Sequence, residues 1–196
     1  MSDLLVRIDR TLSNVETPLN LLGGVFIMAL AGLGITQVIL RSALGLSIPG
    51  YIDFVEQGTA FFAFLGLAYT QRTGAHIRME LLLQSLPRAA VWRLEVVNTL
   101  FAGIVVVLLI PGAWQHFLRA FTIGDSTMGI RLPTWPTRLL VVLALVLLLI
   151  RIAVQLWGFL RLSLVRDANP IAVPLPANAA ELAAEEIENT KLEGDK

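Results

Sequence analysis

Hydrophobic positions along the chain gather into four long runs that are separated by short polar segments. The runs cover residues 19–40, 51–71, 94–117 and 135–160. A helix of about 20 apolar residues is about 30 Å long, which matches the hydrocarbon core of a bilayer. The pattern therefore predicts an all-α membrane protein with four transmembrane helices, in a membrane domain that extends from residue 19 to residue 162.

Two shorter segments have a mixed pattern of apolar and charged positions. Residues 1–18 place apolar side chains on one helical face and arginines elsewhere, which predicts an amphipathic interfacial helix that ends at Pro18. Residues 77–86, between the second and third spans, are too short to cross a bilayer. They predict a short helix in the plane of the interface, with an ordinary loop helix as the alternative. Gly74 permits the turn into this segment and Pro87 stops it.

The second span combines acids at its start with a row of small residues. Asp53 and Glu56 lie three residues apart, so they share a helical face and indicate either a cation site or an ion pair with a partner. Alternatively, they are acids that interact favourably with the helix dipole at a hydrated interface. The small residues follow helical spacing and predict a face for close helix packing: Thr59, Ala63, Gly66 and Thr70.

Composition supports the membrane interpretation and excludes several classes of function. The chain is 56% hydrophobic and 15% charged, with a mean hydropathy of +0.73. Its net charge of zero gives no footprint for nucleic acid, and the absence of cysteine excludes disulfides and thiolate metal sites. No catalytic triad, phosphate-binding loop or metal-ligand spacing is present, so we expect no enzyme activity and no cofactor.

The two histidines argue against a haem site as well. His76 is expected at one end of the second span and His116 near the opposite end of the third. The two side chains would then be about a membrane thickness apart, too far to bind one haem together.

Arginines predict the orientation of the chain. Eight of them lie in the first segment, in the loop between the second and third spans, and after the fourth span, against four in the two opposite loops. Because positive residues accumulate on the cytoplasmic side, both termini are expected in the cytoplasm, together with a flexible tail over residues 163–196.

One charge interrupts the last span. Arg151 lies about 24 Å along a helix that begins near Trp135, close to the cytoplasmic boundary. Its side chain either extends to the interface or pairs with Glu95, near the cytoplasmic start of the third span. We predict the pair, which would hold the third and fourth spans in register.

Several short motifs, in this order, resemble the small membrane subunit (DctQ-like) of tripartite ATP-independent periplasmic (TRAP) transporters. They are Glu56-Gln57, Phe61-Phe62, Gly66-Leu67-Ala68, Arg72, Gly74, His76-Ile77, Leu86-Pro87, Ser126-Thr127 and Leu132-Pro133-Thr134-Trp135-Pro136. The resemblance covers about residues 10–162. The family often has paired acids where this chain has Glu56-Gln57, so an essential second carboxylate is not expected.

The resemblance implies partner proteins in a bacterial inner membrane. A large permease subunit would hold the sodium and substrate sites, and a periplasmic binding protein would deliver the substrate, usually an organic acid. The small subunit would enlarge the static scaffold of the complex. Its interface or structural residues would be Glu56, Thr59, Ala63, Gly66, Arg72, Gly74, His76, Pro87, Glu95, Pro133, Trp135 and Arg151.

Two other functions stay open on the sequence alone. A self-sufficient homo-oligomeric permease would need polar residues facing a pore, and Gln37, Asn98 and Gln155 are few. A membrane anchor subunit of an oxidoreductase would have the same number of spans, and a visible absorption spectrum would test it.

Overall fold

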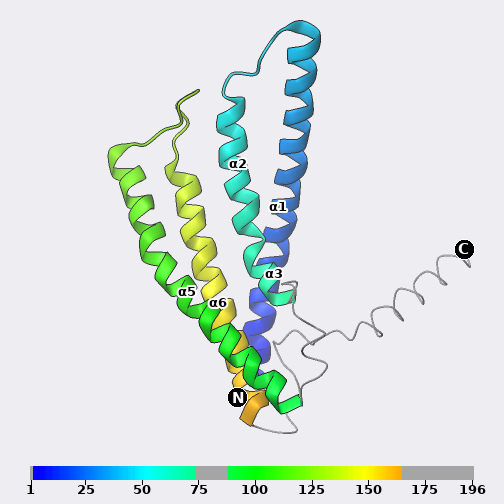
Figure 1. Cartoon of the computed structure of the whole chain (residues 1–196), viewed down its shortest axis with the longest axis vertical. Coiled ribbons are helices and arrows are strands. Elements are labelled where there is room, and N and C mark those ends of the chain that lie inside the picture. Colours follow the sequence, from blue (N-terminus) through cyan, green and yellow to red (C-terminus); the bar gives the residue numbers. More distant parts are fainter. Residues whose placement is uncertain (1, 74–87, 165–196) are drawn as a thin grey trace, which may run out of the picture.

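The computed structural model describes residues 2–73 and 88–164, and its secondary structure is helical (Figure 1). This confirms the predicted all-α class. The helices are α1 (Ser2–Leu44), α2 (Tyr51–Leu65), α3 (Leu67–Thr73), α5 (Arg88–Ile123) and α6 (Trp135–Leu164). The predicted in-plane helix over residues 77–86, with Gly74, His76 and Pro87, lies outside the described residues, as does the tail.

The helices form two antiparallel pairs, α1 with α2 and α5 with α6 (Figure 1). Helix α6 joins the pairs, because it also contacts α2, α3 and α1. The pairs approach one another at the end where α1 begins and α6 ends, and the two connecting loops lie at the opposite end (Figure 1). We call these the terminal end and the loop end of the bundle.

Within residues 2–73 and 88–164, three single helices are long and apolar enough to cross a membrane: α1, α5 and α6. They correspond to three of the four predicted spans, and α6 begins at Trp135, as its sequence indicates. The prediction of one continuous helix over residues 51–71 is wrong, because α2 ends at Leu65 and α3 begins at Leu67. The amide of Gly66 donates to the carbonyl of Phe64 instead of continuing the α-helical pattern, and glycine is the weakest helix former after proline.

The predicted end of the first helix at Pro18 is also wrong. Helix α1 continues through Pro18 and joins the amphipathic segment to the first span. Pro18 has no N–H to donate to the carbonyl of Asn14. Side chains reinforce the adjacent carbonyl of Ser13, which accepts from Thr17 Oγ1 at 2.8 Å and from Arg72 Nη1 at 3.3 Å. Packing also holds the first turns in place, because they rest on α6. Tertiary contacts therefore override the local cost of the proline.

Candidate functional site: two polar clusters and an apolar groove

A group of four charges, two of them buried, lies at the terminal end of the bundle. Arg151 on α6 is 2% exposed, and its Nη1 lies 2.6 Å from Oδ1 of Asp9 on α1. Its Nε lies 3.7 Å from Oε1 of Glu16, and Arg72 on α3 lies 3.6 Å from the other oxygen of Glu16. Asp9, Glu16, Arg72 and Arg151, the ionic cluster, thus contain two charges of each sign and connect three helices.

Neutral polar groups complete this cluster. Gln71 Nε2 donates to Gln155 Oε1, and Gln155 Nε2 donates to the carbonyl of Gln71, each at 2.9 Å. Arg72 also lies over the ring of Tyr69, 4.9 Å from its centroid. The carboxylate of Glu16 has no hydrogen bond within the described part of the chain, so its charge is balanced by the two guanidinium groups alone. The short helix α3 is therefore held by polar contacts to both α1 and α6.

The predicted pair between Arg151 and Glu95 is wrong, because the ion partners of Arg151 are acids of α1. Glu95 is buried on α5. A signal for the true partners exists in the sequence: Leu5, Asp9, Leu12 and Glu16 follow helical spacing and share one face of α1. Two acids on an otherwise apolar face indicate a buried cationic partner.

A second cluster lies at the loop end and is centred on Asp53, in the first turn of α2. Its Oδ2 accepts from Thr127 Oγ1 at 2.9 Å and from the amide of Ile130 at 2.7 Å. Its Oδ1 accepts from the amide of Gly129 at 3.4 Å. A Cβ at residue 129 would lie 2.6 Å from Oδ2, so any larger residue there would displace the carboxylate. Asp53 and these three loop residues form the loop cluster.

The rest of the loop end is also well connected. Arg138 Nη2 lies 2.5 Å from Oδ2 of Asp125, and Thr137 donates to Gln57 of α2. Pro133 forms an isolated antiparallel bridge with Ser126. The carboxylate of Asp53 is thus engaged by the loop between α5 and α6, whereas Glu56 is exposed.

Small residues of α2, α3 and the break between them divide between the inside and the outside of the bundle. In the predicted packing stripe, Thr59 and Ala63 are exposed, while Gly66 and Thr70 are half-buried. The close approach between α1 and α2 is made instead at Gly58, where an added Cβ would lie 2.9 Å from Leu30. Thr59 and Ala63 are therefore available for contact with a neighbour outside this chain.

Aromatic side chains form a continuous series along the loop end of α5. Trp114 and Phe117 have ring centroids 5.2 Å apart, and the series continues to Phe121 at 5.9 Å. Trp135, the first residue of α6, meets Phe121 edge-on at 5.8 Å. Tryptophan gathers in the headgroup layer of membranes, so the series marks that layer at the loop end.

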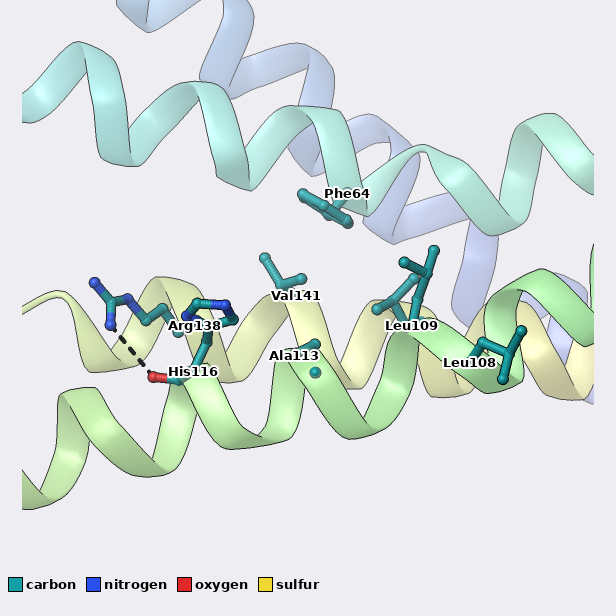
Figure 2. Close-up of a pocket in the computed structure, with 9 residues that line it drawn as sticks. Phe64, Leu108, Leu109, Ala113, His116, Arg138 and Val141 are labelled. Atoms are coloured by element: carbon teal, nitrogen blue, oxygen red, sulfur yellow. Dashed lines mark hydrogen bonds between the residues drawn. The ribbon is translucent and has the colours of Figure 1, made fainter.

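A groove of about 560 Å³ lies between α2, α5 and α6 (Figure 2). Phe64 points into it from α2, opposite Val141 of α6 and Ala113 of α5 (Figure 2). The lining is apolar except at one end, where His116 and Arg138 lie together and Arg138 Nη1 donates to the carbonyl of His116 at 3.3 Å. Within the described residues, no group of three or more acidic or histidine side chains is placed to hold a metal ion.

Comparison with protein families identifies the bundle. The family described as tripartite ATP-independent periplasmic transporters, DctQ component, matches residues 30–162. The chain belongs to the DctQ family. The match covers α2, α3, α5, most of α6 and the second half of the span in α1. Comparisons with curated proteins and with solved structures give no match.

Family membership confirms the resemblance seen in the motifs. The protein is the DctQ component of a TRAP transporter, a membrane protein with several helical spans and not an enzyme. The ionic cluster falls partly outside the family match, because Asp9 and Glu16 precede residue 30.

Proposed function

We propose that this DctQ component braces the large, sodium-coupled permease subunit of its transporter, for uptake of an organic acid that a periplasmic binding protein delivers. In this proposal the protein lies in a bacterial inner membrane with both termini in the cytoplasm. Helices α2 and α3 together form the second of the four spans. The loop cluster then faces the periplasm and the ionic cluster lies near the cytoplasmic boundary.

One observation carries the proposal: the small residues of α2 that favour close helix packing are exposed on the outside of a bundle that is internally well connected. Thr59 and Ala63 are exposed, although membrane helices approach most closely at residues of this size. Buried charged groups, by contrast, form ion pairs and hydrogen bonds with other residues of the same chain, in the ionic cluster and at Asp53. This division suits a static scaffold that presents a packing face to another subunit.

Co-purification with the large subunit tests the proposal. The chain should be expressed together with the large subunit and the binding protein of its transporter, and Ala63→Leu should weaken recovery of the large subunit at least tenfold and reduce uptake. Ala31→Leu is the matched control, because Ala31 is exposed on α1. Thermal unfolding of each variant chain alone should stay unchanged. Normal assembly and uptake in Ala63→Leu would show that this face of α2 meets lipid and not the large subunit.

A further inference from the structure

The groove between α2, α5 and α6 changes in polarity along its length. His116 and Arg138 form its polar end, and Leu108 is the farthest position from them on α5 (Figure 2). Leu108 precedes His116 by eight positions, which is about 12 Å along a helix. Half of a hydrocarbon core is about 15 Å, so the groove has the depth of roughly one leaflet.

The polar end of the groove lies at the height of the headgroup layer. Trp114 precedes His116 by two residues on α5, and Trp135 lies one turn before Arg138 on α6. Both tryptophans belong to the aromatic series that marks this layer. The apolar part of the groove therefore begins at the headgroups and extends toward the middle of the bilayer.

These observations decide what kind of molecule fits the groove. Water is disfavoured, because an apolar cavity offers it too few hydrogen-bond partners. A complete membrane helix from a partner would cross both leaflets, whereas this groove covers only one. A phospholipid matches the order of the lining, with its chain against apolar side chains and its phosphate near a histidine and an arginine.

We propose that the groove binds one membrane glycerophospholipid. One acyl chain lies between Phe64, Leu109 and Leu145, and the phosphate contacts the side chains of His116 and Arg138. Arg138 keeps its ion pair with Asp125 and uses the remaining donors of its guanidinium group toward the lipid. The lipid joins α2 to α5 on this side of the bundle, where α6 makes the main contacts between the two helix pairs of the described structure.

Gly112 offers a direct test, because it lines the groove and an added Cβ there would have no atom within 4 Å. Gly112→Leu therefore places an apolar side chain in the groove from a position where its Cβ meets no protein atom. Gly32→Leu is the matched control: Gly32 lies in α1, away from the groove, and its Cβ position is also open. Leu109→Trp fills the groove from a second position, in case the first variant fails to fold.

Bound lipid is measured by native mass spectrometry. The full-length chain and its variants are extracted from membranes in mild detergent, washed, and re-exposed to phosphatidylglycerol at fixed concentration. We expect one lipid per chain to survive washing in the parent and in Gly32→Leu, and its occupancy to fall at least tenfold in Gly112→Leu and Leu109→Trp. His116→Leu should retain several-fold less.

Two results would overturn the proposal. One is equal lipid occupancy in the parent and in both groove-filling variants, which would assign the retained lipid to the general surface. The other is the absence of retained lipid in the parent, combined with loss of the large subunit from Gly112→Leu preparations. That combination would assign the groove to a segment of the partner.

Discussion

Replacing Arg151 by methionine tests how much the ionic cluster contributes to stability. The change keeps an apolar stem of similar length but removes the contact to Asp9 at 2.6 Å and the contact to Glu16 at 3.7 Å. The Asp9 side chain is 29% exposed, so water can replace the arginine there. Glu16 is 1% exposed and has no such alternative.

The expected cost follows from this difference. Removing one partner of a buried ion pair costs about 3–5 kcal/mol, because the other charge is left buried and uncompensated. We expect the lower end, about 3 kcal/mol, since Arg72 still lies 3.6 Å from Glu16. For a chain of this size, about 2–4 °C per kcal/mol corresponds to a melting temperature lower by roughly 6–12 °C.

A double-mutant cycle in detergent, followed by tryptophan fluorescence during heating, makes the test specific. Glu16→Gln alone should lower the melting temperature slightly, because Arg151 keeps Asp9. In the Arg151→Met background the same change should raise the melting temperature, because it removes a buried charge that Arg72 alone would then balance. Glu95→Gln is the control and should have the same effect in both backgrounds. An equal decrease for Glu16→Gln in both backgrounds would refute the coupling that the structure indicates.

Three further predictions concern other parts of the bundle. Gly58→Ala should destabilise the chain by about 1–3 kcal/mol in thermal unfolding, because its Cβ would lie 2.9 Å from a leucine of α1. Gly66→Ala should instead stabilise the chain by up to about 1 kcal/mol, because its Cβ would have no atom closer than 3.5 Å. The opposite order of stability would contradict the packing of α2 against α1. Asp53→Asn removes the negative charge to which three loop donors bind, so proteolysis within residues 124–134 should become at least several-fold faster. An unchanged rate would show that other contacts hold the loop. In this cysteine-free chain, Met128→Cys, at a fully exposed position, should react with an impermeant maleimide in intact cells while Asn189→Cys should not, and the reverse labelling would invert the proposed orientation.

The sequence predicts the helices well where local signals agree with packing. Helix α6 begins at Trp135, as the Pro-Thr-Trp-Pro motif indicates, because proline suits the first turn of a helix. At Pro18 the same residue type misleads, since local chemistry predicts a stop while contacts from Arg72 and α6 hold the helix together. Gly66 misleads in the opposite direction, because a long apolar run conceals the break between α2 and α3.

The polar clusters are harder to predict, because their partners are distant in sequence. Arg151 was expected to meet an acid of α5, and its depth near the boundary gave no information about which helix lay beside it. The hydrogen-bond donors to Asp53 are separated from it by 74 to 77 positions in the sequence. They lie in a loop whose shape depends on Gly129 and on Arg131, which has a left-handed backbone with φ of 55°. Such contacts depend on the tertiary arrangement, which a periodic pattern does not specify.

The lengths of the helices have a consequence for the forces that hold the bundle together. Counting from Trp135 in the headgroup layer, Val154 lies about 28 Å along α6, near the opposite edge of the hydrocarbon core. Helix α6 continues for ten residues beyond Val154, and the core of Leu5, Leu12 and Val154 lies at this edge. The helices therefore leave the lipid while they are still packed against one another.

Solvent differs along the same helices as a result. We expect the terminal end to lie in water, where exclusion of apolar surface from water favours packing and contributes a heat-capacity change on unfolding. In the lipid this contribution is missing, and close fit and hydrogen bonds hold the helices together. Urea, which weakens the exclusion of apolar surface from water, is therefore expected to separate the helices at the terminal end first, while the lipid-embedded part stays assembled.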